Sequence, residues 1–348
     1  MNVAALGPQG FGTYDVEWTA EGPVFTAEPG DPELMLIPGF VDIHFHGAFG
    51  IDFMSATTEQ MIELVELLIR EGYETVLPTT VTASADDISA AFSHLPDHPM
   101  IGGFHLEGPF ISPKFPGAQP QGFIVDPPTE SSEWDAILDD PRLRVITLAG
   151  ERPGAIALIE RLDERGVRVS LGHTDASAAE ARAAIDAGAK HTTHTYNAMR
   201  GLHHRDVGML GTAMIADELM CELIYDRLHV SEQAALLLMM TKGIENVIAV
   251  SDSTMATGLA EGTRLTMWGL ECLVGRDEVR LLDGTLAGSG ITLYTAFKNL
   301  CHDFGPEAAI RLCCVNPRAA LNLSEIRVWL EIDANLDIVR RHHVRYNF

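Results

Sequence analysis

From Phe40 onward, short apolar runs alternate with longer stretches whose hydrophobic residues recur at helical spacing. The stretch 58–71 is typical of an amphipathic helix, because Met61, Leu64, Val65 and Leu68 fall on one face. Similar helical patterns occur at 86–92, 133–138, 153–164, 178–187 and 231–241. Apolar runs bounded by glycine, proline or polar residues predict strands at 40–46, 75–80, 101–107, 145–149, 167–172, 191–196, 221–225 and 247–251.

This alternation of strands and helices predicts a (β/α)8 barrel of the TIM type, because eight strand–helix units of this total length match that fold. In such barrels the functional residues lie at the carboxyl ends of the strands. The segment 1–36 differs from the rest, since glycine and proline break its short apolar pieces. It predicts a few small strands that form a minor appendage.

The composition is that of an ordinary globular chain, with 46% hydrophobic and 21% charged residues among 348. No apolar run approaches the roughly 20 residues of a membrane span, and residues 1–10 lack the pattern of a secretory signal. We therefore expect a cytoplasmic location. The five cysteines are odd in number and lack Cys-x-x-Cys spacing, which argues against a disulfide framework and a thiolate zinc site.

The formal net charge of −25 changes what the chain can bind. A field of this sign repels nucleic acid, anionic lipid and anionic metabolites, so neither nucleic acid nor a membrane is a predicted partner. An anionic small-molecule substrate would need a local cationic pocket.

Polar residues at the predicted strand ends carry the candidate chemistry. His44 and His46 share one face of the first strand, although an isolated pair of this kind is more often a simple strand end. Glu107, His173 and His194 end the third, fifth and sixth strands, and Asp252 ends the eighth. This nitrogen and oxygen set suits Zn²⁺ or Fe²⁺, and the surplus of carboxylates favours an open site where bound water becomes a nucleophile. His105, one layer lower in its strand, is predicted to be a hydrogen-bonded core residue.

Five ordered motifs then make the chain similar to a known family. They are Pro38-Gly-Phe-Val-Asp-Ile-His-Phe-His-Gly47, His105-Leu-Glu-Gly-Pro-Phe110, Leu171-Gly-His-Thr-Asp175, Thr193-His-Thr-Tyr-Asn-Ala-Met199 and Val250-Ser-Asp252. The chain resembles the amidohydrolase superfamily and, within it, the N-acetylglucosamine-6-phosphate deacetylase family. The resemblance implies that Glu107, His173 and His194 hold the principal metal and that Asp252 is the catalytic acid and base.

The resemblance also implies one or two divalent metals per subunit. The fourth strand ends in Thr147-Leu-Ala-Gly150 and offers no bridging lysine, so Glu107 must serve as any bridge. Because His44 and His46 are both present, a second metal site is expected.

The family's substrate-binding positions can be carried over residue by residue. They fall on Ala118, Gln119, Asn197, Ala198, Arg205, Asp226, His229, Leu286, Ala287 and Gly288. Arg205 matches a phosphate-binding arginine, and His229 is expected to reach the site of a neighbouring subunit, which implies a homodimer. Two residues depart from the family pattern: Gln119 stands where a histidine is common, and Arg227 replaces a glycine.

The resemblance implies a metal-dependent hydrolase barrel at 37–323, with a reduced small β domain built from 1–36 and 324–348. Within the latter, strands are predicted near 326–330 and 336–339. The implied reaction is hydrolysis of the acetamide of N-acetylglucosamine 6-phosphate to glucosamine 6-phosphate and acetate, in amino-sugar catabolism or cell-wall sugar recycling. In it, Asp252 takes a proton from the metal-bound water, Gln119 helps to polarise the acetyl carbonyl, and Asp252 then protonates the departing amine.

Two alternatives stay open. One is an amidohydrolase acting on another N-acetyl hexosamine phosphate or on a cyclic amide. The other, from a different class, is a non-catalytic barrel used as an assembly module. Loss of metal ligands would mark such a module, and the motifs above retain them.

Overall fold

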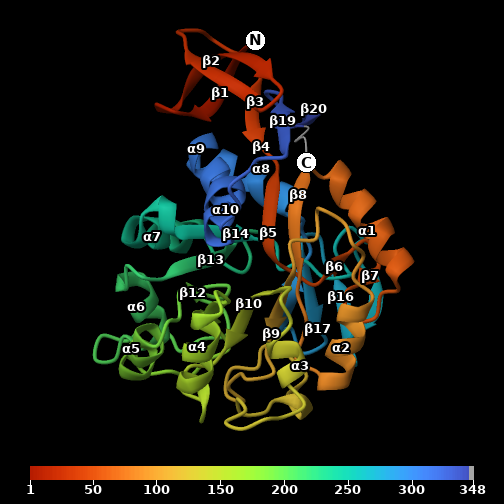
Figure 1. Ribbon diagram of the computed structural model, residues 1–348, viewed down its shortest axis with the longest axis vertical. Helices are drawn as coiled ribbons and strands as arrows, with labels where there is room; N and C mark the ends of the chain where they lie inside the picture. Colours follow the sequence, from red (N-terminus) through yellow and green to blue (C-terminus); the bar gives the residue numbers. More distant parts are fainter. Residues whose placement is uncertain (345–348) are drawn as a thin grey trace.

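The centre of the molecule is a barrel of parallel strands, seen in the computed structural model, which describes residues 1–344 (Figure 1). Its strands are β5 (Phe40–Phe45), β8 (Tyr73–Pro78), β9 (Phe104–Glu107), β10 (Leu143–Leu148), β11 (Arg168–Leu171), β12 (His191–Thr192), β13 (Met220–Ile224) and β14 (Val247–Val250). β9 to β14 form one parallel sheet, and β5 pairs with β8. Parallel bridges between Thr79 and His105 and between Phe45 and Ser253 close the ring. The predicted (β/α)8 barrel is confirmed.

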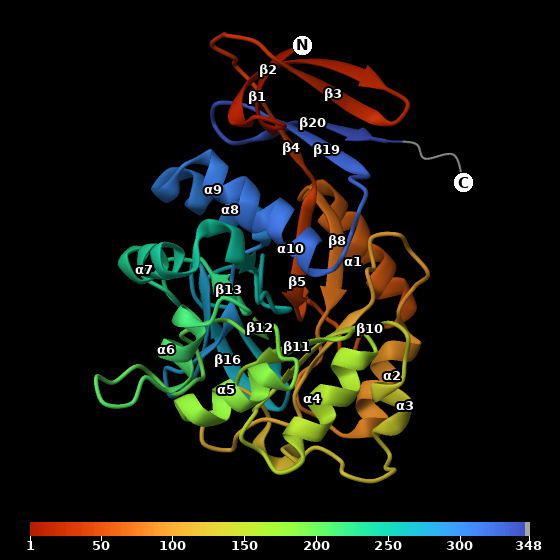
Figure 2. The same ribbon diagram turned by 60° about the vertical axis from the view of Figure 1, so that its left-hand side comes forward.

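Helices surround the barrel between successive strands (Figure 2). They are α1 (Thr58–Arg70), α2 (Ala85–Ser93), α3 (Asp135–Leu138), α4 (Ala155–Glu164), α5 (Ala178–Asp186), α6 (Gly208–Ile215) and α7 (Glu232–Lys242). α1 starts where it does because Thr57 and Gln60 form a capping box, each side chain accepting from the other's backbone N–H. α6 was not predicted from the sequence. Nearly all of this helix is apolar and buried, so it has no polar stripe to reveal a helical period.

Three further helices follow the last barrel strand and were also not predicted. α8 (Leu293–Phe304), α9 (Pro306–Ile310) and α10 (Asn316–Ala320) lie between the barrel and a small sheet. Arg318 of α10 makes a two-pronged ion pair with Glu74 of β8, and both side chains are buried. Glu74 also accepts hydrogen bonds from the backbone N–H groups of Arg327 and Val328, just before and at the start of a small-sheet strand. This carboxylate therefore ties the barrel to the small sheet.

The small sheet contains strands from both ends of the chain in the order β20-β19-β4-β1-β2-β3. These strands are β1 (Asn2–Gly7), β2 (Gly10–Thr19), β3 (Gly22–Ala27), β4 (Met35–Pro38), β19 (Val328–Ile332) and β20 (Ile338–His343). The strands expected near 326–330 and 336–339 are thus present with shifted ends. Residues 345–348 of the expected small domain lie outside the described residues.

A four-stranded antiparallel sheet between β14 and α8 was not predicted. It consists of β15 (Arg264–Met267), β16 (Leu270–Val274), β17 (Glu278–Leu281) and β18 (Leu286–Ser289), and it has its own small core. One signal was present, since Asp283-Gly284 is a turn sequence that favours a hairpin. The sheet is joined to the barrel end, because Ser289 donates its N–H to the carbonyl of Asp252 at 2.8 Å. A short hairpin of β6 (Gly47–Ala48) and β7 (Ile51–Asp52) lies beyond β5.

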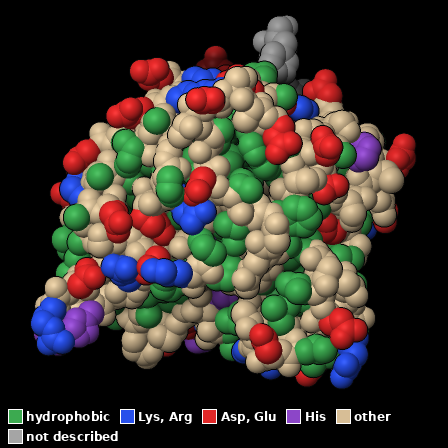
Figure 3. Space-filling view, turned by 90° about the horizontal axis from the view of Figure 1, so that it is seen from below, with side chains coloured by type: hydrophobic (Ala, Val, Ile, Leu, Met, Phe, Trp, Pro, Cys, Tyr) green, Lys and Arg blue, Asp and Glu red, His purple; other side chains and the backbone are tan. Residues whose placement is uncertain are grey.

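The orientation of the strands places the functional end of the barrel. β5 and β8 point away from the small sheet, so the carboxyl ends of the barrel strands lie at the opposite end of the molecule (Figure 2). Seen from that end, histidine side chains show within a hollow, and acidic side chains are spread over the surrounding surface (Figure 3). Among the described residues, no helix is long and apolar enough to span a membrane.

Candidate metal centre and substrate pocket

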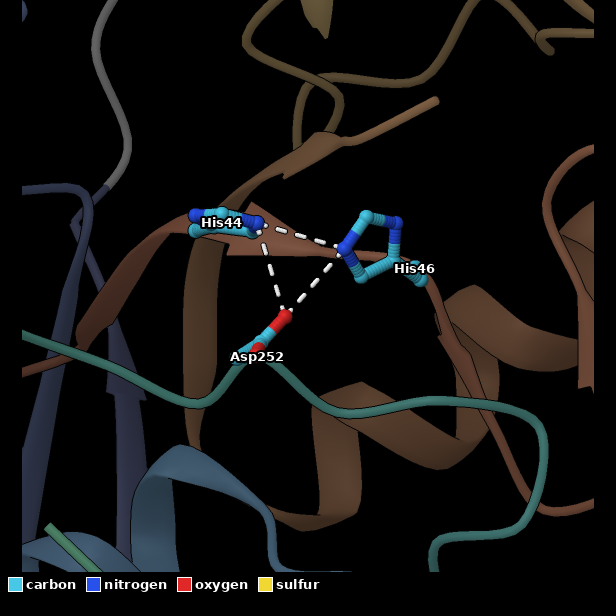
Figure 4. Close-up of side chains that lie close together, drawn as sticks. All are labelled: His44, His46 and Asp252. Atoms are coloured by element: carbon cyan, nitrogen blue, oxygen red, sulfur yellow. Dashed lines mark hydrogen bonds and ion pairs between the residues drawn. The ribbon is translucent and has the colours of Figure 1, made fainter. Parts of the chain in front are cut away.

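Three side chains from the seam between the first and last barrel strands form a first cluster (Figure 4). His44 lies in β5, His46 lies just beyond it, and Asp252 follows β14. The Nε2 atoms of the two histidines are 3.2 Å apart. Oδ1 of Asp252 lies 3.4 Å from Nε2 of His44 and 3.2 Å from Nε2 of His46. The three atoms therefore face a common centre.

A second cluster lies beside the first and comes from the third, fifth and sixth barrel strands. It contains Glu107, His173 and His194, all buried. Oε1 of Glu107 is 3.3 Å from Nε2 of His173 and 3.2 Å from Nε2 of His194. The two Nε2 atoms are 3.1 Å apart.

Glu107 connects the two clusters. Its Oε1 lies 3.3 Å from Nε2 of His44, and its Oε2 lies 3.4 Å from Nε2 of His46. One carboxylate thus faces both histidine pairs, in the arrangement that a bridging ligand requires.

The spacing of these atoms fits divalent metal ions. A tetrahedral site with bonds of about 2.0–2.1 Å has edges of about 3.3 Å, and the measured separations are 3.1–3.4 Å. Oε1 of Glu107 is buried and makes no hydrogen bond with the described residues, a state that proteins usually avoid. Because the donors are imidazole nitrogen and carboxylate oxygen, the set suits Zn²⁺ or Fe²⁺ better than Ca²⁺ or Mg²⁺.

Nearby histidines keep the carboxylates of Glu107 and Asp252 ionised. Burial raises the pKa of Glu107, but His44, His173 and His194 outweigh it and hold that pKa well below its ordinary value. Burial likewise raises the pKa of Asp252, and His44 and His46 bring it down to about 2. Asp252 is therefore ionised at neutral pH, which is the state that accepts a proton.

Contacts to Nδ1 hold three of the four histidines, His44, His46 and His173, in orientation. Nδ1 of His44 lies 3.1 Å from Oε2 of Glu222, that of His46 lies 3.1 Å from the carbonyl of Thr79, and that of His173 lies 2.9 Å from the carbonyl of Phe115. Such partners fix the tautomer that leaves Nε2 free to bind a metal. His105 is a core residue as predicted, because it is fully buried and contacts the carbonyl of Ile43 and the hydroxyl of Thr147.

Three of these residues have left-handed backbone conformations. The φ angles of His173, His194 and Asp252 are 47°, 29° and 49°. Side chains other than glycine rarely adopt such angles, and this strain is typical of functional sites. Each residue comes two positions after its strand ends, so the turn directs its side chain inward over the barrel mouth.

Both clusters open into a cavity of about 400 Å³. Its walls come from the loops after the barrel strands and from the four-stranded sheet. The lining residues are His46, Glu107, Gly117, Ala118, Gln119, His173, His194, Asn197, Ala198, Ile224, His229, Asp252, Trp268, Arg280, Gly284, Thr285, Leu286 and Gly288.

A family model described as the amidohydrolase family matches residues 35–326 of this chain. The chain belongs to the amidohydrolase family. Among characterised relatives, N-acetylglucosamine-6-phosphate deacetylase of Lysinibacillus sphaericus is 37% identical over 273 residues, covering 76% of this chain and 70% of the relative. N-acetylgalactosamine-6-phosphate deacetylase of Escherichia coli O157:H7 is 35% identical over 307 residues, covering 85% and 80%.

Solved structures of amidohydrolases show the same architecture. N-acetylglucosamine-6-phosphate deacetylase from Thermotoga maritima has a TM-score of 0.89 at 30% identity, covering 98% of this chain and 97% of its own. A variant of the Mycobacterium smegmatis deacetylase, in complex with N-acetyl-D-glucosamine-6-phosphate, has a TM-score of 0.88 at 29% identity, covering 99% and 98%.

Most of the substrate-binding residues expected from the amidohydrolase resemblance reach the cavity. Ala118, Gln119, Asn197, Ala198, His229, Leu286 and Gly288 line it. Asp226 does not line it but lies behind His229, and its Oδ2 is 2.6 Å from Nδ1 of that histidine. Ala287 does not line the cavity and is fully buried in the core of the four-stranded sheet, so its expected role in substrate binding stays a prediction.

The two residues expected at the phosphate differ in their position relative to the cavity. Arg205 lies on an exposed loop, bonds to the neighbouring ring of His204, and does not line the cavity of its own chain. His229 was expected to reach a neighbouring subunit. Its side chain is 5% exposed, bonded to Asp226 and part of its own chain's cavity, and its reach to a neighbouring subunit stays a prediction.

The two departures from the family pattern have structural explanations. Arg227 has a φ of 66°, the conformation for which glycine is favoured, and its guanidinium is held by Asp303 at 2.6 and 2.8 Å. Gln119 accepts a hydrogen bond from the N–H of Thr82 and donates one to Oε2 of Glu107 at 2.6 Å. One amide hydrogen of Gln119 thus positions the carboxylate, and the other makes no hydrogen bond among the described residues.

Sequence reasoning missed three residues of this amidohydrolase site. Glu222 belongs to none of the sequence motifs, and it contacts His44 only because the barrel closes. Trp268 and Arg280 belong to the unpredicted four-stranded sheet, yet both line the cavity. The Trp268 ring lies 5.4 Å from that of His46, and its indole N–H donates to Asp52 at 2.9 Å.

Proposed function

We propose that this amidohydrolase hydrolyses the acetamide of N-acetylglucosamine 6-phosphate to glucosamine 6-phosphate and acetate, in amino-sugar catabolism or cell-wall sugar recycling. The observation that carries the proposal is the pair of clusters sharing Glu107 at the floor of the cavity. It is supported by the reaction named for the relatives in Lysinibacillus sphaericus and Bacillus subtilis.

The proposed roles follow from the contacts of each residue. Glu107, His173 and His194 hold the principal divalent metal, and His44, His46 and Asp252 hold a second. A metal at this position supplies a Lewis acid for the carbonyl and lowers the pKa of water. The Asp252 carboxylate accepts the proton of the attacking water and then delivers it to the departing amine. The free amide hydrogen of Gln119 donates to the acetyl oxygen.

The test is direct. Protein purified without added metal is assayed for acetate release from N-acetylglucosamine 6-phosphate, and its metal content is measured. We expect one or two equivalents of Zn²⁺ or Fe²⁺ and catalytic turnover that chelation abolishes and Zn²⁺ or Fe²⁺ restores. Absence of acetate release from metal-loaded protein would contradict the function.

A second candidate substrate is N-acetylgalactosamine 6-phosphate, because the Escherichia coli O157:H7 relative is named for it. The two sugars differ only in the configuration of one hydroxyl. The two sugars are ranked by measuring kcat/KM on a panel of N-acetyl hexosamine phosphates, with a cyclic amide as a structurally distant substrate. The highest value on the glucosamine compound supports the first assignment.

We also propose a homodimer in the cytoplasm. Its support is a set of exposed apolar side chains on the two contacting helices α6 and α7, namely Ile215, Leu236, Leu237 and Met240. Ile215 is 74% and Met240 75% exposed, and apolar side chains grouped in this way mark interaction surfaces. We expect light scattering to give twice the chain mass of 37.9 kDa and Met240→Glu to give the monomer. Ile62→Glu, on the exposed face of α1, is the matched control and leaves the dimer intact.

A further inference from the structure

An indole ring forms one wall of the cavity, beside the cluster of His44, His46 and Asp252. Trp268 lies in the turn between β15 and β16, and among residues 1–344 it is the sole phenylalanine, tyrosine or tryptophan that lines the cavity. Its ring centroid lies 5.4 Å from that of His46, and the two rings are tilted by 65°. His46 directs its Nε2 toward Asp252 (Figure 4), so the indole stands next to the proposed catalytic carboxylate.

Trp268 has a backbone conformation that its side chain does not favour. Its φ is 53°, in the left-handed region where glycine is the favoured residue. A tight turn between two strands does not require an indole, so the turn alone does not explain this residue. Strain of this kind persists where surrounding contacts hold it, and it is common at functional sites.

A buried carboxylate fixes the indole ring. The indole N–H donates to Oδ2 of Asp52 at 2.9 Å, and Oδ1 of the same carboxylate accepts the backbone N–H of Met54 at 2.9 Å. Asp52 ends β7, and the next residue, Phe53, donates its N–H to the carbonyl of His46 at 2.9 Å. One short hairpin therefore holds both the indole and His46, which fixes the wall relative to the cluster.

A residue expected to bind the sugar lies beside the other cluster. A Cβ atom placed on Gly117 would lie 3.2 Å from Cε1 of His173 and 3.8 Å from Cβ of Ala198, so these two side chains flank the same point. Both also line the cavity. Trp268 and Ala198 thus lie beside different clusters, with Glu107 between them.

We propose that Trp268 limits the length of the acyl group that this chain removes, which rests on the proposed deacetylase function. A secondary amide is trans, so the acyl tail and the sugar leave the C–N bond on opposite sides. With the sugar at the Ala198 end of the cavity, the tail is directed toward the indole. A methyl group fits beside the ring, whereas each further methylene meets it. Trp268 is then a specificity-determining residue, and Asp52 positions it.

The experiment compares Trp268→Gly and Trp268→Phe with the control Leu282→Ala. Glycine suits the left-handed φ, so this change removes the ring without adding backbone strain. Leu282 lies in the β17–β18 turn of the same sheet, is 57% exposed and lies outside the cavity. Each protein is assayed on glucosamine 6-phosphate that carries an N-formyl, N-acetyl, N-propionyl or N-butyryl group. Metal content and melting temperature are measured on every variant.

We expect Trp268→Gly to raise the ratio of kcat/KM for the N-butyryl over the N-acetyl substrate by at least about tenfold. The scale follows from apolar pockets, in which one methylene changes kcat/KM by about 10–200-fold. Trp268→Phe should fall between glycine and the wild type, because a smaller ring remains. Leu282→Ala should match the wild type.

Asp52→Asn tests the positioning of the ring. An amide has one oxygen for the two N–H groups that the carboxylate accepts, so the indole loses its fixed position. The ratio for N-butyryl over N-acetyl should rise, but by less than in Trp268→Gly. A residue that only supports the fold would lower kcat/KM on all four substrates and leave the ratio unchanged.

An unchanged ratio in Trp268→Gly, or equal losses on all four acyl groups, would overturn the assignment of Trp268. If Trp268→Gly loses its metal, the ratios of Trp268→Phe and Asp52→Asn decide, and wild-type ratios in both would overturn the assignment. A metal-loaded wild-type protein inactive on both the N-formyl and the N-acetyl substrate would instead overturn the deacetylase function itself.

Discussion

Oε2 of Glu222 lies 3.1 Å from Nδ1 of His44, and both side chains are fully buried. The same carboxylate oxygen accepts the backbone N–H of His194 at 3.1 Å. Glu222 thus joins one histidine from each metal cluster. A carboxylate in this position fixes the tautomer of the histidine and raises its basicity toward a metal.

We predict that Glu222→Ala weakens metal binding at the His44 and His46 cluster by about 10–100-fold, the usual effect of removing such a partner. Metal content at increasing chelator concentration measures this. Glu222→Gln should lose less, because its amide oxygen still accepts both hydrogen bonds. If the alanine variant keeps the metal affinity of the wild type, Glu222 has only a packing role.

Asp252→Asn tests the proposed proton transfer. The side chain keeps its shape but loses the ability to accept a proton, so kcat should fall by about 10²–10⁴. Unchanged near-ultraviolet circular dichroism would show that the fold is retained. A kcat close to that of the wild type would contradict the proposed role of Asp252 in proton transfer.

Replacing both His44 and His46 by alanine separates the two clusters. We expect loss of at most one metal per chain, because Glu107, His173 and His194 remain as a set of three ligands. Hydrolysis should weaken without disappearing. Metal content and rate equal to those of the wild type would leave the pair a structural feature.

The buried ion pair between Glu74 and Arg318 should contribute strongly to the free energy of unfolding. Both side chains are at least 93% buried, and Glu74→Ala leaves the guanidinium without a charged partner. We predict a loss of about 3–5 kcal/mol in the free energy of unfolding, measured by denaturant titration. The control is Glu307→Ala, which breaks a partly exposed pair with Arg311 and should cost less than about 1 kcal/mol. Equal effects at the two sites would contradict the buried ion pair as the cause.

Local pattern was sufficient to predict the barrel and to place the candidate metal ligands at one end of it. Buried parallel strands are short apolar runs, amphipathic helices show their period, and residues directly after such strands must meet at one end of the barrel. His173 and His194 could therefore be assigned to one site without knowing their distance, because both follow barrel strands. The same reasoning separated His105 from them, since it lies one layer deeper in its strand.

The remaining parts of the site depend on contacts between distant segments. Glu222 meets His44 across 178 positions of sequence, and only barrel closure makes them neighbours. Trp268 and Arg280 reach the cavity because an inserted sheet is joined to the backbone of Asp252. A sequence determines which residues can act as ligands through local periodicity. Which of them share a cavity is decided by how loops and inserted strands pack, because that packing depends on long-range contacts with no local signature.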